Sequence, residues 1–146
     1  MGHIDVGRTA LGAVVAAIIL YVAGFIIHGV ILVPAWEAYS AAMGDRIHPL
    51  PHGAALAVFA VVSLINGTIG LMTYVGMRPR FGAGPRTALL AGLMLWAAAF
   101  LTPALGQYAT GVYPASIIVV GCIGFLIASL IALIAGAFLY REQVAT

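Results

Sequence analysis

Charged residues are scarce in this sequence, and its four long apolar stretches contain none. Asp, Glu, Lys and Arg make up 7% of the 146 residues, whereas hydrophobic residues make up 64%. The stretches cover residues 10–33, 53–75, 87–106 and 116–139, and every formal charge lies between them or towards the chain ends. Because a charge at the middle of a bilayer costs about 2.5–3.5 kcal/mol, this distribution predicts a polytopic membrane protein.

Other absences exclude whole classes of function. The single cysteine, Cys122, excludes an internal disulfide and a two-cysteine redox relay. The first stretch has no carboxylate, which four-helix multidrug exporters need there to exchange protons for cations. The net charge of +2 comes from few residues and predicts no nucleic-acid partner. Each enzyme or transporter class considered lacks its essential side chain, so we expect no enzymatic activity.

The lengths of the apolar stretches predict the fold. Each has about 20–24 residues, enough for an α-helix to cross a hydrocarbon core of about 30 Å. None shows the period-two alternation of a membrane β-strand. We therefore predict an all-α fold, a polytopic transmembrane four-helix bundle that forms one domain over residues 1–146. Thr9 and Thr87 are the predicted N-caps of the first and third helices.

Prolines mark the predicted connections and one predicted kink. Five lie outside the apolar stretches, where a missing N–H does no harm: Pro49, Pro51, Pro79, Pro85 and Pro114. Pro34 ends the first stretch, and residues 35–43 after it form a predicted short interfacial helix closed by Gly44. Pro103 lies inside the third stretch, where we expect it to kink the helix.

The placement of arginine predicts the orientation. Five arginines fall on one side of the predicted membrane: Arg8, Arg78, Arg80, Arg86 and Arg141. Only Arg46 falls on the other side. Because cytoplasmic loops carry the excess of Lys and Arg, both the N- and the C-terminus are predicted to be cytoplasmic, in a multi-pass protein of the bacterial inner membrane.

Small residues predict how the helices pack. Four of them recur at every fourth position of the last stretch: Gly124, Ala128, Ala132 and Gly136. Such a stripe lets a neighbouring backbone approach closely, either within the bundle or in a dimer. Asn66 lies near the middle of the second stretch and is predicted to face protein, with Ser63 and Thr68 as further interhelical contacts.

His28 is the only conventional acid–base side chain inside any apolar stretch. By helical rise it lies about 7–8 Å below the predicted outer boundary. A buried imidazole needs a partner for its N–H, or a metal. One hypothesis is a hydrogen bond to Thr102 or to a carbonyl freed by Pro103. The other is ligation of a metal by the imidazole.

The second hypothesis rests on a local resemblance. The segment from Gly24 through His28 to Leu32 places a small residue one turn before the histidine. It resembles the small-xxx-His-xxx-Leu segment of bacterial light-harvesting antenna polypeptides. The resemblance implies that His28 ligates a tetrapyrrole, either haem or bacteriochlorophyll, and that Gly24 leaves room for the flat macrocycle.

The outer connection offers a different candidate site. Asp45, His48 and His52 lie close together in the sequence and are a candidate periplasmic zinc or copper site. Pro49 and Pro51 make the segment between the histidines extended, so helical ligand spacing does not apply to it.

Several short motifs follow one another along the chain: Gly24, Pro34-Ala35-Trp36, Met43-Gly44, residues 92–96, Thr102-Pro103 and Tyr140-Arg141. Together they resemble a domain-of-unknown-function family of small bacterial four-helix inner-membrane proteins. His28 stands where we would expect an aromatic residue in that family. The resemblance implies a four-helix fold in the inner membrane and no established activity.

Three functions follow as expectations. The leading hypothesis is an accessory or structural subunit of a membrane complex, packed against other membrane helices or against copies of itself. The second is a tetrapyrrole-binding membrane protein that uses His28. The third is a small transporter or lipid-binding protein with a cavity lined by Asn66, Thr102 and Gln107.

Overall fold

The structure, a computed structural model, describes residues 5–140, and that part of the chain is all-helical without a strand. Its elements are α1 (Val6–Ile26), the π-helical turn η1 (Ile27–Ile31), α2 (Val33–Met43), the 3-10 turn η2 (Gly44–Arg46), α3 (His52–Phe81), α4 (Pro85–Trp96), the π-helical turn η3 (Ala97–Leu101), α5 (Thr102–Thr110) and α6 (Ala115–Leu139). Four helical spans are long and apolar enough to cross a membrane: Val6–Ile31, His52–Phe81, Pro85–Thr110 and Ala115–Leu139. The prediction of four membrane-length helices is therefore confirmed.

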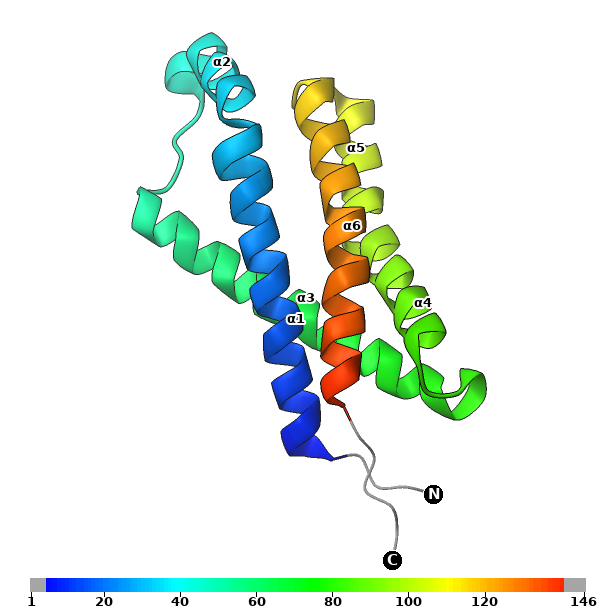
Figure 1. The fold of residues 1–146 in the computed structure, drawn as a ribbon. Helices are drawn as coiled ribbons and strands as arrows, with labels where there is room; N and C mark the ends of the chain where they lie inside the picture. The colour runs from blue at the N-terminus through cyan, green and yellow to red at the C-terminus, as the bar shows by residue number, and fades with distance from the viewer. Residues whose placement is uncertain (1–4, 141–146) are drawn as a thin grey trace, which may run out of the picture.

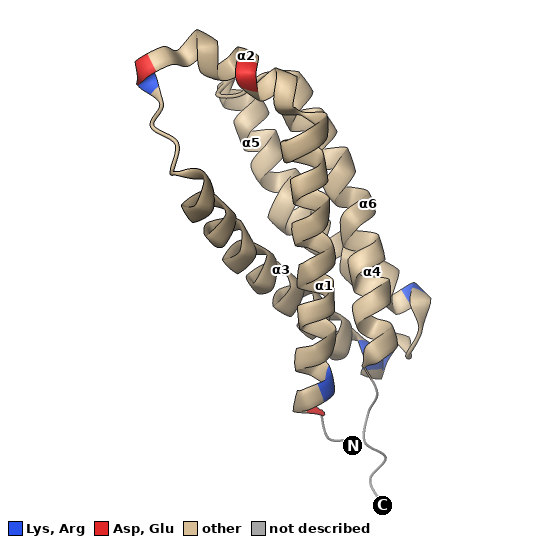
Figure 2. Cartoon of the chain, turned by 60° about the vertical axis from the view of Figure 1, so that its left-hand side comes forward, with Lys and Arg blue, Asp and Glu red and all other residues tan. Residues whose placement is uncertain are grey.

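Three of the four spans run roughly alongside one another, and the span formed by α3 does not (Figure 1). Helix α1 packs on α3 and α6, and α4 packs on α6 and α3. Helix α3 crosses the others obliquely, and its N-terminal half diverges from them in both ribbon views (Figures 1 and 2). The start of α1, the end of α6 and the connection between α3 and α4 all lie at one end of the molecule. The packed core is therefore concentrated towards that end.

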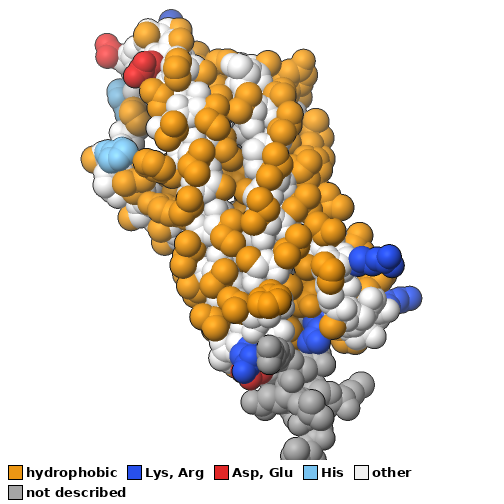
Figure 3. Space-filling view, in the orientation of Figure 1, with side chains coloured by type: hydrophobic (Ala, Val, Ile, Leu, Met, Phe, Trp, Pro, Cys, Tyr) orange, Lys and Arg blue, Asp and Glu red, His pale blue; other side chains and the backbone are white. Residues whose placement is uncertain are grey.

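Charge is confined to the two ends of the described chain (Figure 2). Arg8, Arg78, Arg80 and Arg86 belong to the end where α1 starts. The acidic residues of α2 and η2 lie at the other end, with one arginine beside them. Between the ends, most side chains on the face drawn in Figure 3 are hydrophobic. A surface of this kind suits the hydrocarbon of a bilayer.

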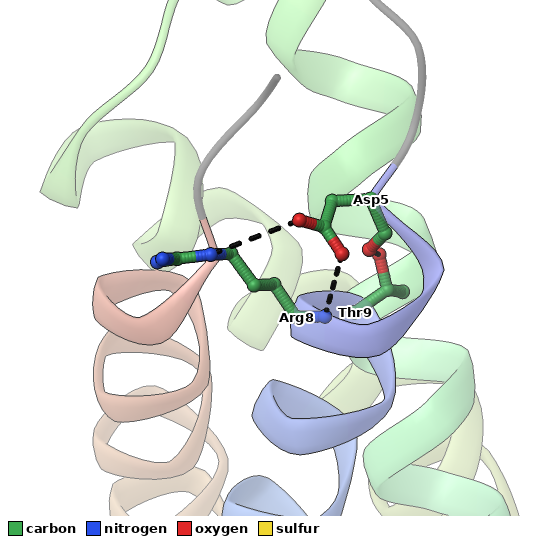
Figure 4. A network of polar contacts seen from close by, with 3 residues as sticks. All are labelled: Asp5, Arg8 and Thr9. Atoms are coloured by element: carbon green, nitrogen blue, oxygen red, sulfur yellow. Dashed lines mark hydrogen bonds and ion pairs between the residues drawn. The ribbon is translucent and has the colours of Figure 1, made fainter.

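Helix α1 begins earlier than predicted because its N-cap is Asp5, not Thr9 (Figure 4). The Asp5 carboxylate accepts from the backbone N–H of Arg8 at 3.0 Å. The Arg8 guanidinium lies 3.7 Å from the same carboxylate. The Thr9 hydroxyl donates to the Asp5 carbonyl at 2.7 Å. The hydrophobic pattern shows only where the apolar stretch starts, at residue 10. The polar residue that caps the helix lies several residues before it.

Two other predicted boundaries are wrong. Helix α3 continues to Phe81, so Pro79 lies inside its last turn and not in a connection. The next span starts at Pro85, whose missing N–H is harmless in a first turn, and Thr87 is not its N-cap. The Thr87 hydroxyl instead donates to the carbonyl of Gly82 at 2.7 Å, tying the span to the turn before it.

The region after Pro34 is helical, as predicted, and α2 covers Val33–Met43. Gly44 ends this helix with a positive φ of 53°, a conformation that glycine adopts at little cost. At its other end, α2 follows the first span after a bend at Leu32, where φ is −93° and ψ is 4°.

Helices α1 and α6 approach closely through glycine. A Cβ atom added to Gly12 would lie 2.6 Å from the Gly136 carbonyl oxygen, and one added to Gly136 would lie 2.7 Å from the Gly12 carbonyl oxygen. Ala128 and Ala132 of the predicted stripe are buried in the same core. Gly124 faces the side chain of Ile27, which a Cβ would meet at 2.5 Å. Each member of the stripe thus contacts or is buried within the chain itself.

Helix α3 meets α1 at Gly67, not through the polar residues beside it. A Cβ on Gly67 would lie 2.6 Å from the Ala13 carbonyl oxygen. Thr68 is exposed, and its hydroxyl donates to Leu64 within the same helix, so its predicted interhelical role is wrong. Asn66 is half-buried, and no hydrogen bond joins its side chain to another helix within residues 5–140. Steric fit, not hydrogen bonding, holds this contact.

The close approach of α1 and α6 at Gly12 predicts that an added methyl group destabilises the protein at this position but not at an exposed glycine. Gly12→Ala forces a methyl group against backbone and is expected to reduce the free energy of unfolding by about 1–3 kcal/mol. The matched change Gly76→Ala, in an exposed helical position with nothing within 4 Å, is expected to be neutral or stabilising. Unfolding in mixed micelles with increasing SDS measures both. Equal effects of the two substitutions would contradict the close crossing.

Candidate functional site

Two π-helical turns flank the candidate site. One is η1 in the first span, and the other is η3 in the third span. A proline follows each turn, Pro34 at the start of α2 and Pro103 at the start of α5. The ring of a proline displaces the carbonyl four residues earlier, and a widened turn relieves that clash. The predicted disturbance at Pro103 therefore takes the form of a π turn.

The π turns keep the backbone hydrogen-bonded. The N–H of Leu32 donates to the Ile27 carbonyl, five residues earlier, at 2.9 Å. The N–H of Thr102 donates to the Ala97 carbonyl in the same way, and the Thr102 hydroxyl adds a bond of 2.8 Å to that oxygen. Thr102 is thus committed to its own helix and does not contact His28. Its predicted partnership with the histidine is wrong.

A cavity of about 480 Å³ lies between these turns and α6. This size falls within the usual range for small-molecule sites. Its walls come from six elements and the α5–α6 connection: His28, Trp36, Phe59, Ala99, Phe100, Pro103, Ala104, Gln107, Tyr113, Ile117, Ile118, Gly121, Cys122 and Phe125. Gln107 lines it as predicted, but Asn66 and Thr102 do not. Of the described residues that line it, none is Asp, Glu, Lys or Arg.

His28 is held by Trp36. The indole Nε1–H donates to the imidazole Nδ1 at 3.2 Å, and the ring centroids lie 5.9 Å apart. In a straight α-helix, residues eight apart would be separated by about 12 Å along the axis. The π turn and the bend at Leu32 bring the two rings together.

This hydrogen bond fixes the tautomer of His28. An indole nitrogen can only donate, so Nδ1 must carry a lone pair, and the proton of the neutral imidazole sits on Nε2. Nε2 faces α6, where a Cβ added to Gly121 would lie 3.6 Å from it. Within residues 5–140, Nε2 has no hydrogen-bond partner. His28 therefore contributes one N–H donor to the cavity wall.

Aromatic rings gather where α2 and the α5–α6 connection border the cavity. Tyr113, in the connection before α6, lies 5.6 Å from Trp36 and 5.4 Å from Tyr39 between ring centroids. Trp36 and Tyr39 are 6.0 Å apart in an edge-on arrangement. Aromatic rings with a polar edge favour the membrane interface. The cluster joins α2 to the start of α6 and holds Trp36 in position.

A second aromatic group forms the inner wall. Phe100 of η3 stacks on Phe125 of α6, with centroids 4.3 Å apart and planes 7° apart. Phe125 also lies 5.9 Å from the ring of His28. Trp96 donates its indole N–H to the Cys122 carbonyl at 2.9 Å, fastening α4 to α6 beside the cavity. Sequence reasoning missed these partners because they come from spans far apart in the chain.

The residues around His28 do not fit a ligated tetrapyrrole. The space beside Gly24 is filled by Phe125, whose Cζ would lie 3.3 Å from a Cβ at that position. A metal-ligating histidine normally donates its other ring N–H, whereas the Nδ1 of His28 accepts from Trp36. The protonated Nε2 consequently has no lone pair for iron or magnesium.

The residues of the predicted metal site, Asp45, His48 and His52, do not come together in the structure. Within residues 5–140, no group of three or more His, Cys, Asp or Glu side chains lies close enough to hold a metal ion. Asp45 is part of η2, His48 is exposed in the extended segment, and His52 opens α3. Extended chain between the two prolines keeps these side chains from converging.

No family model, curated protein or solved structure matches this chain. The resemblance to a family of small four-helix inner-membrane proteins therefore stays a prediction. Evidence on function comes from the cavity and the surfaces of the helices.

The His28–Trp36 contact predicts a tautomer that NMR can measure. Imidazole ¹⁵N shifts of the wild-type protein are expected to show His28 protonated at Nε2. Trp36→Phe removes the indole N–H that donates to Nδ1, so both tautomers become populated. The matched change Trp96→Phe, at the second of the two tryptophans, is expected to leave the tautomer of His28 unchanged. A wild-type His28 protonated at Nδ1 would contradict the hydrogen bond.

Proposed function

We propose that this chain is a multi-pass protein of the bacterial inner membrane with both termini in the cytoplasm. The arginines of the described chain support this orientation, since Arg8, Arg78, Arg80 and Arg86 belong to the end where α1 starts and only Arg46 to the other. On this proposal the cavity opens in the outer half of the membrane, near the periplasmic interface.

Cysteine labelling on intact cells tests the orientation. In a Cys122→Ala background, Asp45→Cys is expected to react with a membrane-impermeant maleimide, because η2 faces the periplasm. Ala83→Cys, in the connection between α3 and α4, is expected to react only after lysis. Labelling at position 83 in intact cells would reverse the proposed topology.

We propose further that the protein binds a lipophilic molecule of the outer leaflet in its cavity. The observation that carries this proposal is the composition of the walls, which are apolar and aromatic with few polar groups, chiefly His28, Gln107 and Tyr113. Sites for small apolar ligands have this character, with polar groups that fix orientation.

The position of α3 gives such a molecule a way in. Phe59, in its diverging N-terminal half, lines the cavity and is nevertheless 60% exposed. Helix α3 packs mainly on α1 and α4, whereas α5 supplies another part of the cavity wall. The cavity is therefore bordered by a side chain that faces the surrounding lipid.

A binding role suits the site better than a catalytic one. Among the described lining residues, His28 is the only histidine and none is Asp, Glu or Lys, and one nitrogen of His28 is occupied by Trp36. General acid–base chemistry on an apolar substrate normally needs a further group to orient or neutralise the histidine. We therefore keep a non-enzymatic role as the proposal.

A second candidate is the accessory subunit of a membrane complex. Helix α3 is the least buried of the four spans. Its N-terminal half exposes large apolar side chains: Val58, Phe59, Val61, Val62, Leu64 and Ile65. A neighbouring membrane helix would pack on such a surface, and a bound lipophilic molecule would then be shared between the two proteins.

Filling the cavity tests the binding proposal. Ala104→Phe places a ring in the cavity and is expected to remove most of the lipophilic molecule that copurifies with the protein in mild detergent. Ala98→Phe, an exposed position outside the lining, is the matched control and is expected to retain it. Native mass spectrometry of the purified protein counts the bound molecules. Equal occupancy in both variants would contradict binding in the cavity.

A further inference from the structure

The cavity also indicates what kind of molecule it recognises, an inference that rests on the proposed binding function. We infer that the occupant is a neutral lipophile whose buried end is a flat ring bearing a carbonyl oxygen, the class to which quinones belong. The carbonyl accepts a hydrogen bond from Nε2–H of His28, and the ring lies against the aromatic inner wall.

The donor is the first part of the argument. Trp36 can only donate, so it keeps the lone pair of His28 on Nδ1 and the proton on Nε2. A ligand that offered a donor at this point would force the imidazole to change tautomer and to lose the Trp36 bond. An oxygen acceptor instead completes the hydrogen bonding of the ring without rearrangement. At Nε2 of His28 the wall therefore selects for an acceptor.

The absence of charge is the second part. No Asp, Glu, Lys or Arg is among the described residues that line the cavity. A phosphate or ammonium group brought into such walls would lose its hydration without gaining an ion pair. The buried end of the ligand must therefore be neutral, which disfavours a phospholipid headgroup and leaves a carbonyl or ether oxygen.

The shape of the cavity wall favours a flat ring over a branched lipid as the occupant. Phe100 and Phe125 stack on each other with planes 7° apart, so a further flat ring can add to the outer face of this pair, and Phe125 lies 5.9 Å from His28 between ring centroids. A planar ring stacks on this surface while its oxygen reaches Nε2. Gln107, from α5, adds an amide that can donate to a second oxygen. A branched glycerol ester has no planar ring to stack on this pair.

The size and the border of the cavity fit a ring with a tail. A volume of about 480 Å³ holds a substituted ring and the first part of an alkyl or isoprenoid chain. The rest of the chain can leave past Phe59, whose side chain borders both the cavity and the lipid. The ligand would then be anchored by its ring and remain in contact with the bilayer.

The test titrates the full-length protein in detergent with three probes, and native mass spectrometry reads the occupancy. The probes are a benzoquinone with a decyl tail, its reduced and doubly O-methylated form, which lacks carbonyls, and dioctanoylglycerol, which carries ester carbonyls instead. The quinone is expected to bind at least tenfold more tightly than either of the others.

Variants at His28 assign the donor. His28→Gln keeps an N–H in a similar place and is expected to bind the quinone within about threefold of wild type, whereas His28→Leu is expected to weaken binding about tenfold, the effect of one lost hydrogen bond to a buried carbonyl. Infrared difference spectra add a readout independent of stability. The carbonyl band of the bound quinone is expected at lower wavenumber than in detergent alone, and this shift should vanish in His28→Leu.

The outcomes separate this inference from the proposed function. Quinone binding lost in Ala104→Phe but unchanged in His28→Leu, with no infrared shift, would overturn the recognition by His28 and leave the cavity as a binding site. Tighter binding of dioctanoylglycerol than of the quinone would overturn the ring and point to an ester carbonyl. Failure of all three probes to compete with the copurified molecule would also overturn the class named here. Equal quinone binding in Ala104→Phe and Ala98→Phe would overturn the proposal that the cavity is the binding site.

Discussion

Inside a bilayer, backbone N–H and C=O groups must find partners within the protein, because hydrocarbon offers none. Pro34 and Pro103 each remove a donor from a membrane-length helix and displace a carbonyl four residues earlier. Both helices respond with a π turn, in which a later N–H reaches the carbonyl five residues back. The bend at Leu32, the contact of Trp36 with His28 and the walls of the cavity all depend on these two turns. Satisfying the backbone thus shapes the site.

The same helices pack differently in their two halves. Towards the end where α1 starts, Gly12 and Gly136 bring two backbones into direct contact, and Ala132 is fully buried between helices. Towards the other end the facing residues are large rings, with His28 opposite Phe125. Small side chains give a tight seam that resists change, whereas rings that meet across bends leave unfilled volume between them. The half where α1 starts is therefore tightly packed, and the half around His28 contains the cavity.

The sequence predicts this fold better than it predicts this site. Runs without charge locate four spans because the hydrocarbon excludes ions. They do not locate helix ends, which depend on interfacial groups such as the Asp5 cap and on turns that tolerate Pro79. His28 stands out as an isolated polar residue, but its partner Trp36 lies eight residues on and beyond a bend. No hydrophobic periodicity indicates a π turn, and none indicates that Phe125 fills the space beside Gly24.

The length of α3 has a consequence for the whole molecule. A helix from His52 to Phe81 is about 45 Å long, well beyond a hydrocarbon core of about 30 Å, and α3 runs obliquely. A long helix adapts to bilayer thickness by changing its tilt. Since α1 and α4 contact α3 in its C-terminal half, around Gly67 and Gly70, a change of tilt moves mainly the N-terminal half that carries Phe59. The position of Phe59 at the border of the cavity is therefore coupled to the thickness of the surrounding membrane.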